Sequence, residues 1–196
     1  LEKAVQLDPR FIQAYAYLAR VHALMYWYHF DHTEERAAKS KEAAGKALEL
    51  GPDIAEAHYA LGTYYYNCQL DYEKALKQLF FALEKQPKNT DVLEYIAYVK
   101  RRQGKLDESV VYLKRAFEIN PRSVEITRNL GMTYFLLRNY VEGERFLKLA
   151  ISFSPDYISS YIAPSASLAF LDISWEGHTR KAREVLEEAS KRIASP

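Results

Sequence analysis

The segment "MYWYHFDHTEER", residues 25–36, gathers side chains that can do chemistry. His22, Tyr26 and His29 are separated by four and three residues, so they would share one helical face. Asp31 and His32 follow in the next turn and could add oxygen and nitrogen ligands. One interpretation is a metal-binding module at the 22–32 histidine cluster, and the other is an extended helical hairpin whose aromatics cover its own end. No HExxH motif or paired Cys/His spacing supports the first, so we predict no metal and no cofactor. The candidate ligands would be His22, Tyr26, His29, Asp31 and His32.

Composition excludes several classes of function. The 196 residues are 48% hydrophobic, and 27 basic residues nearly balance 26 acidic ones, so no overall field favours nucleic acid or an anionic membrane. No stretch reaches the roughly 18 apolar residues of a membrane span. We expect a cytoplasmic protein that binds no nucleic acid and no membrane. Because Leu1 opens the chain inside what reads as a helix, we also expect a piece of a longer protein.

No arrangement typical of an active site is recognisable. The chain has one cysteine, Cys68, and contains neither GxSxG nor a glycine-rich phosphate loop. Its carboxylates resemble ordinary surface acids of helices. We therefore predict that this chain is not an enzyme.

Prolines divide the chain at nearly regular intervals. Five of them close similar phrases such as "ALELGP", "ALEKQP" and "AFEINP", at separations of 43, 35, 34 and 34 residues. In an otherwise helical sequence, a period near 34 is typical of stacked helical hairpins, none of which buries its apolar face alone. The five are Pro9, Pro52, Pro87, Pro121 and Pro155.

Within these phrases the sequence resembles the tetratricopeptide repeat (TPR) family, which has Leu-Gly, then Tyr, later Ala, a bulky apolar residue and Pro. The second full repeat has His58, Leu61, Gly62, Tyr65, Ala75, Leu79, Ala82 and Pro87. The third has Leu93, Ile96, Ala97, Leu113, Ala116 and Pro121, with Lys100 and Ser109 as departures. The fourth has Leu130, Gly131, Tyr134, Leu147, Ala150 and Pro155, with Thr127 and Gly143 as departures.

The resemblance implies an all-α fold: a right-handed superhelical solenoid of about five antiparallel helix pairs plus one truncated helix. We expect a single TPR domain over residues 1–196, since no flexible linker interrupts it. Residues able to cap the next helix follow four prolines: Asp53, Asn89, Ser123 and Asp156. The expected parts are a truncated repeat (1–8), an enlarged repeat (10–52), regular repeats (53–87, 88–121, 122–155) and an irregular capping repeat (156–196).

Two places depart from the period. Nine extra residues fall on the segment 25–36, where we expect each helix of that hairpin to lengthen by about one turn, with Asp31 or Thr33 as an N-cap. In the last repeat Pro164 stands where Leu is usual, so this repeat is either a degenerate cap or a junction to further sequence. Trp175 is either core or an exposed anchor, and we favour core.

The TPR resemblance implies a scaffold whose first helices line a concave groove that binds a protein or peptide. The groove is predicted from first-helix positions that the packing pattern leaves free, which are rich in Tyr, Arg and Met as binding hot spots are. The predicted groove residues are Tyr59, Thr63, Tyr66, Asn67, Glu94, Tyr98, Arg101, Arg102, Arg128, Met132 and Phe135.

The partner is less defined than the surface. The phrasing is similar to TPR segments of bacterial signalling proteins, including nucleotide cyclases, winged-helix regulators and protein kinases, so we expect a part of a larger signalling or regulatory protein. Self-association into a homo-oligomer is an alternative. The basic cluster "KRRQGK", residues 100–105, would suit phosphate, but acidic residues follow it and a solvated hairpin turn is the preferred interpretation.

Overall fold

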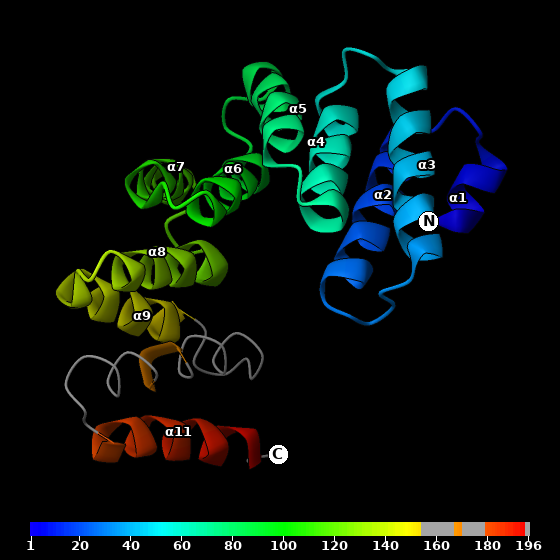
Figure 1. Ribbon diagram of the computed structural model, residues 1–196. Helices are drawn as coiled ribbons and strands as arrows, with labels where there is room; N and C mark the ends of the chain where they lie inside the picture. Colours follow the sequence, from blue (N-terminus) through cyan, green and yellow to red (C-terminus); the bar gives the residue numbers. More distant parts are fainter. Residues whose placement is uncertain (154–166, 170–178, 195–196) are drawn as a thin grey trace. The chain divides into compact units, whose positions relative to one another are not determined.

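The computed structural model describes residues 1–153, 167–169 and 179–194, and every element described there is helical, which confirms the all-α prediction (Figure 1). The chain forms two compact units, Leu1–Val99 and Lys100–Pro196. The expectation of one continuous domain stays a prediction. Pro164, Trp175, the cap at Asp156 and much of the expected capping repeat lie outside the described residues.

Both units consist of successive helices joined by short turns (Figure 1). Unit 1 contains α1 (Glu2–Leu7), α2 (Ile12–Trp27), α3 (Glu34–Leu50), α4 (Ala55–Tyr64), the π-helical turn η1 (Tyr65–Gln69), α5 (Tyr72–Lys85) and most of α6 (Thr90–Arg102). Unit 2 contains α7 (Leu106–Ile119), α8 (Val124–Leu136), α9 (Tyr140–Phe153) and α11 (Thr179–Ala194).

The caps explain where most of these helices begin. The Ser123 hydroxyl accepts a hydrogen bond from the Ile126 backbone at 3.3 Å, and the Asn89 side chain accepts one from Val92 at 3.2 Å, as predicted. The prediction for Asp53 is wrong. There the helix begins one residue later, after Ile54, and no side chain caps it.

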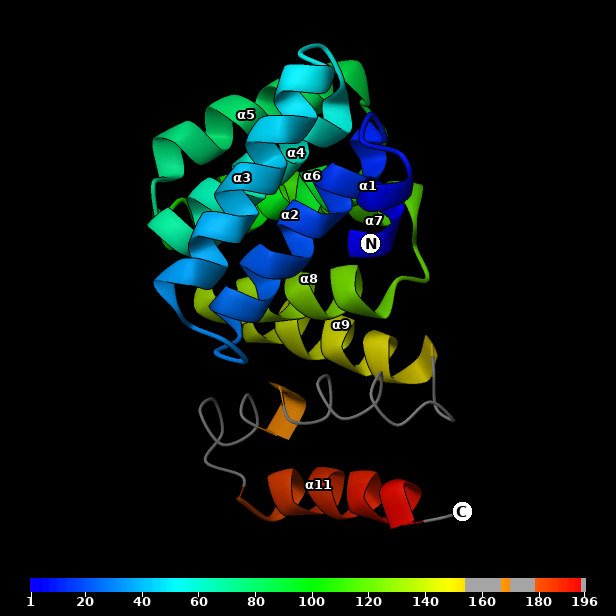
Figure 2. The ribbon, with the colours of Figure 1, turned by 90° about the vertical axis from the view of Figure 1, so that its right-hand side faces the viewer.

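Small residues set the distance between paired helices. A Cβ added at Gly62 would lie 2.9 Å from Leu79 Cγ, and one added at Gly131 would lie 2.7 Å from Leu147 Cγ. Between α2 and α3, alanines take the place of these glycines and allow the two helices to pack closely. Figures 1 and 2 both show α2 and α3 side by side. The alanine cluster comprises Ala16, Ala19, Ala43, Ala44, Ala47, Ala57 and Ala60.

The enlarged first pair distributes its extra residues evenly. α2 has 16 residues and α3 has 17, against 13 and 14 in the pair α8 and α9. Each helix is thus about one turn longer, as predicted, and residues 28–33 connect them where residues 137–139 suffice in the later pair. Thr33 is the N-cap of α3 and accepts from the Arg36 backbone at 3.2 Å.

A second irregularity was not predicted. The chain leaves α4 through η1, in which the Leu70 amide donates to the Tyr65 carbonyl, a five-residue step instead of the four of an α-helix. Leu70 then adopts a left-handed conformation with φ of 54°. This turn holds the extra residue of the 35-residue spacing between Pro52 and Pro87, because Gly62 and its partner Leu79 are 17 residues apart. The corresponding Gly131 and Leu147 are 16 apart.

Candidate binding surface on α2, α4 and α6

The polar residues of the enlarged tip are engaged with one another. The Arg36 guanidinium donates to Asp31 Oδ2 at 2.7 Å and to His22 Nδ1 at 2.7 Å, while the Thr33 hydroxyl donates to the other Asp31 oxygen at 2.7 Å. His32 stacks on Tyr26 with ring centroids 3.8 Å apart. A metal ion bound by His22 and Asp31 would have to displace a guanidinium that already occupies both.

No group of three or more His, Cys, Asp or Glu side chains within the described part of the chain is arranged to hold a metal ion. The tip is instead held by Arg36, which is always charged and only donates, so His22 Nδ1 must be the acceptor and its proton lies on Nε2. Burial, reinforced by the neighbouring Arg36 charge, lowers the pKa of His22 below its usual 6.5.

The aromatics of this tip divide into two groups. Trp27 reaches the next repeat and stacks on Tyr66 with ring centroids 5.3 Å apart. Tyr28 and Phe30 contact each other at 6.4 Å and stay 63% and 79% exposed. The tip therefore extends the repeat array through Trp27 and presents two rings outward.

Trp27 belongs to an aromatic cluster formed by α2, α4, η1 and α6 of unit 1. Tyr95 lies at its centre, with ring centroids 5.3 Å from Tyr59, 6.0 Å from Tyr66 and 5.6 Å from Tyr98. Tyr59 and Tyr66 are buried, whereas Trp27, Tyr95 and Tyr98 are partly exposed. The π-helical turn carries Tyr66, so it directly shapes this surface.

Arg20 of α2 lies across the cluster. Its guanidinium carbon is 4.0 Å from the Tyr59 ring centroid and 5.3 Å from that of the exposed Tyr17, and Nη2 is 3.3 Å from Asp91 Oδ2 on α6. Stacking of a guanidinium on a ring face is favourable, more so when partly desolvated. One side chain thereby links helices from three successive pairs.

Two donors in this cluster have no partner. The Tyr59 hydroxyl and Arg20 Nε are buried and make no hydrogen bond with the described residues. Leaving a buried donor unsatisfied costs about 1–3 kcal/mol. Burial also raises the pKa of Tyr59 well above its usual value, so the hydroxyl keeps its proton and remains a donor.

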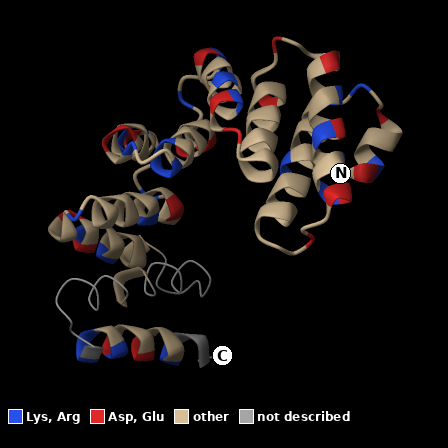
Figure 3. Ribbon diagram, in the orientation of Figure 1, with Lys and Arg blue, Asp and Glu red and all other residues tan. Residues whose placement is uncertain are grey.

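The surroundings of these donors are apolar with an acidic edge. Burial raises the pKa of Tyr95 to about 12, and the neighbouring Asn67 side chain lowers it in part. Asn67 Nδ2 is buried and makes no hydrogen bond with the described residues. The Tyr98 hydroxyl donates to Glu94 Oε1 at 2.9 Å. Figure 3 shows α2 and α4 almost free of charge, because Arg20 and Glu56 are their only charged residues.

Five predicted groove residues thus meet in unit 1: Tyr59, Tyr66, Asn67, Glu94 and Tyr98. Thr63 lies on the same helix but is completely buried, with its hydroxyl donating to the Tyr59 carbonyl at 2.9 Å. Sequence reasoning did not include Trp27 and Tyr95 in the predicted surface. A signal for the region existed in the 35-residue spacing, because an extra residue inside a helix indicates a π-turn.

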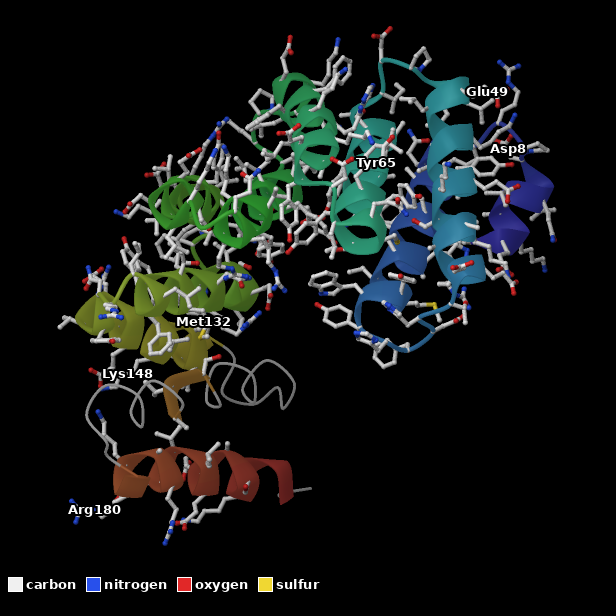
Figure 4. All side chains as sticks on the ribbon, in the orientation of Figure 1. Asp8, Glu49, Tyr65, Met132, Lys148 and Arg180 are labelled. Atoms are coloured by element: carbon white, nitrogen blue, oxygen red, sulfur yellow. The ribbon has the colours of Figure 1, made fainter. Side chains whose placement is uncertain are left out.

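The other predicted residues lie in unit 2. Arg128 bonds Glu125 on its own helix, and Arg101 Nη1 lies 3.4 Å from the Thr133 hydroxyl. Met132, labelled in Figure 4, and Phe135 pack against the core cluster that contains Leu168. Arg102 is exposed. A continuous groove through all eleven residues stays a prediction.

A cavity of about 610 Å³ also lies in unit 1, lined by residues of α1, α2 and α3 that include Tyr15, His22 and Lys46. Its lysines already pair with acids, for example Lys46 with Glu49 at 3.0 Å. The buried side-chain atoms without a hydrogen-bond partner in the described residues are Arg20 Nε, Tyr59 Oη, Asn67 Nδ2 and Gln103 Oε1, and none lines this cavity. The aromatic cluster is therefore the stronger candidate.

Paired helices, small residues at their contacts and an aromatic surface on the first helices define a helical-repeat scaffold. Residues 95–123 match a family model described as Tetratricopeptide repeat. Together with the helical fold, this confirms the resemblance inferred from the sequence, and the family model itself covers residues 95–123. No described helix has the length and apolarity needed to cross a bilayer.

Solved structures with the same fold include repeat proteins of several sources. PilF of Pseudomonas aeruginosa is 18% identical with a TM-score of 0.71, over 94% of this chain and 79% of that chain. MamA from Desulfovibrio magneticus RS-1 is 15% identical with a TM-score of 0.66, over 91% and 94%. YrrB, described as a TPR protein with an unusual peptide-binding site, is 19% identical with a TM-score of 0.61, over 97% and 91%. At these identities the likeness shows the fold.

Proposed function

We propose that this protein is a non-enzymatic scaffold that binds a peptide or protein segment on the aromatic cluster of α2, α4 and α6, within a larger signalling or regulatory protein. The observation that carries the proposal is the cluster itself. The first helices α2 and α6 contribute partly exposed Trp27, Tyr95 and Tyr98 beside Arg20, and α4 between them contributes the buried Tyr59. Tyr, Trp and Arg are the residues that dominate binding energy at protein interfaces.

The surroundings of the cluster also support a ligand. The sequence offers no nucleophile and base arrangement that would make it an active site. Helical repeat arrays in general use such extended surfaces for binding. The similarity in fold to YrrB, whose description names a peptide-binding site, agrees with this use.

A random-peptide library selected on the purified chain tests the proposal. Fluorescence anisotropy would give the affinity of each selected peptide for wild type, Tyr98→Ala and Phe30→Ala. Tyr98 belongs to the cluster, whereas Phe30 is an exposed aromatic residue on the tip and is the control. We expect Tyr98→Ala to weaken binding about 30-fold, the effect of a 2 kcal/mol hot spot, and Phe30→Ala to leave it unchanged.

The opposite pattern would show that another surface binds. If Phe30→Ala abolished binding and Tyr98→Ala did not, the exposed tip would be the interface. If the chain formed a concentration-dependent oligomer that Tyr98→Ala dissolved, the cluster would serve self-association instead. Circular dichroism of both variants separates these results from a loss of fold.

A further inference from the structure

We propose that the aromatic cluster recognises an internal segment of an extended peptide, through an uncharged carbonyl group next to a basic side chain, and that it does not recognise a terminal carboxylate. This inference rests on the proposed function and adds the chemistry of the partner. Its basis is the pair of unpartnered donors, Tyr59 Oη and Arg20 Nε, inside a surface with an acidic edge.

The donors define what the partner must bring. Tyr59 is only 3% exposed, its hydroxyl has no acceptor in the described residues, and its raised pKa keeps the proton in place. Arg20 Nε lacks an acceptor in the same way. A partner that supplies an acceptor would therefore relieve an existing cost, and a peptide carbonyl is the most abundant acceptor that a protein segment carries.

The local charges decide between a neutral carbonyl and a carboxylate. Arg20 is the cation nearest the ring of Tyr59, and it is already paired with Asp91. Glu94 on the same helix as Asp91 faces the Tyr98 hydroxyl, and both acids oppose ionisation of Tyr59. A partner carboxylate would meet Asp91, Glu94 and Arg20, three groups whose charges sum to −1. A neutral carbonyl meets no such repulsion, and a Lys or Arg beside it would be attracted to the exposed Asp91.

Access to Tyr59 requires side chains that cover it to move, and Arg20 is one of them. The Arg20 guanidinium covers the ring at 4.0 Å and is itself only 20% exposed. Its single ion pair is 3.3 Å long, and the Asp91 side chain is 55% exposed, so the ion pair is a weak restraint. The stacking on the Tyr59 ring is the interaction that contacts with the partner must replace. When Arg20 swings outward, both its Nε and the Tyr59 hydroxyl become available to the partner. Arg20 thus acts as a movable cover over the buried hydroxyl.

Tyr59→Phe isolates this role. The substitution removes one hydroxyl that makes no hydrogen bond in the unbound protein, so the thermal midpoint should stay the same or rise. The loss of one hydrogen bond to the partner should weaken binding about 2- to 10-fold. Tyr98→Phe is the comparison for stability alone, because its hydroxyl already donates to Glu94 and its removal should lower the thermal midpoint.

The chemistry of the partner is tested with two libraries of random 12-residue peptides, one displayed with a free C-terminus and one displayed internally between folded segments. We expect the library displayed internally to yield binders enriched in Lys and Arg. Binders from the library with a free C-terminus should keep their affinity when the terminal carboxylate is amidated. In Asp91→Asn, which removes one of the two acids, peptides that end in a free carboxylate should gain affinity relative to wild type.

The outcomes distinguish the two levels of the proposal. If neither library yields peptides sensitive to Tyr98→Ala, the proposed function fails and this inference fails with it. If peptides bind at the cluster but require a free C-terminal carboxylate, or bind Tyr59→Phe as tightly as wild type, only the inference is overturned. Enriched basic internal peptides that lose affinity with Tyr59→Phe support both.

Discussion

The hairpins α4–α5 of unit 1 and α8–α9 of unit 2 have the same packing contact and different surfaces. In both, a glycine on the first helix faces a leucine on the second: Gly62 with Leu79, and Gly131 with Leu147. In the first hairpin the helix continues into the π-turn, whereas in the second it ends at Leu136 and turns through Arg138 with φ of 59°. The interhelical contact is therefore conserved within the molecule while the segment after it varies.

The variable segment changes which side chains are buried. Counting from the shared glycine, Asn67 of η1 corresponds to Leu136 of α8. Asn67 is buried beside the aromatic cluster, and Leu136 is 47% exposed. One extra residue, accommodated by the π-turn, thus accompanies a polar group held in an aromatic surface. The comparison suggests that packing positions fix the repeat and that the residues between them are free to build a site.

The largest expected change in stability comes from comparing two single-residue deletions, one in each hairpin. Deleting Cys68 from η1 restores a 16-residue spacing between Gly62 and Leu79, so we expect the π-turn to become an ordinary helical turn. The free energy of unfolding should then change by less than about 1 kcal/mol. Deleting Leu137 shortens the separation of Gly131 and Leu147 from 16 positions to 15 and turns the buried face of α9 by about 100°.

The deletion of Leu137 should cost about 3 kcal/mol or more, because Leu147 and Ala150 are completely buried. Urea denaturation followed by circular dichroism measures both variants. Equal losses in the two deletions would show that η1 is not the place where the extra residue is absorbed.

A smaller effect is expected from a methyl group at the shared glycine. In Gly131→Ala the new Cβ would lie 2.7 Å from Leu147 Cγ and 3.1 Å from the Gly143 carbonyl, so the backbones must separate. We expect a loss of about 1–2 kcal/mol after the gain in helix propensity. The contacts at Gly62 are longer, at 2.9 and 3.3 Å, so Gly62→Ala should cost less.

Gly45→Ala provides the control for these two substitutions. Gly45 is an exposed residue inside α3, and a Cβ there would meet nothing within 4 Å. The helix propensity of alanine should then stabilise the protein by up to about 1 kcal/mol. A loss of stability in Gly45→Ala as large as that in Gly131→Ala would mean that backbone effects, and not the approach of the helices, explain the result.

The repeat could be predicted from the sequence because its packing positions recur. Gly62, Gly131, Leu79 and Leu147 are all set by contacts within one hairpin, and such local contacts leave a periodic pattern. The nine extra residues of the first repeat could be placed for the same reason, since the flanking repeat positions are intact on both sides.

The site was less predictable because its contacts are not periodic. Arg20 and Asp91 pair across 71 positions of the chain, and no spacing indicates that partnership. Thr63 was expected on the groove because the packing pattern leaves it free, but its hydroxyl bonds the Tyr59 carbonyl and the residue is fully buried. A position that the repeat does not require is therefore not necessarily exposed.

The smallest expected effect separates the two units by their response to pH. His22 is buried in unit 1, whereas the described residues of unit 2 contain no histidine. Its lowered folded pKa means that the unfolded chain takes up a proton first as the pH falls below 6.5. The contribution of neutral His22 to stability is therefore fully present above pH 6.5 and is lost as the pH falls through its pKa in the folded protein. The charged groups around His22 are Arg36, Glu2, Lys39 and Asp31.

Urea denaturation between pH 7.5 and 5 should show this loss in wild type and less of it in His22→Gln, whose amide oxygen can still accept from Arg36. Hydrogen bonds from Thr33 and Arg36 lower the pKa of Asp31 below its usual 3.8, so Asp31 stays ionised over this range and contributes no slope. Trp27 fluorescence in a Trp175→Phe background reports on unit 1, because Trp27 stacks on Tyr66. An identical pH slope in both proteins would assign the loss to groups other than His22, and the first repeat would then differ from the later ones in length alone.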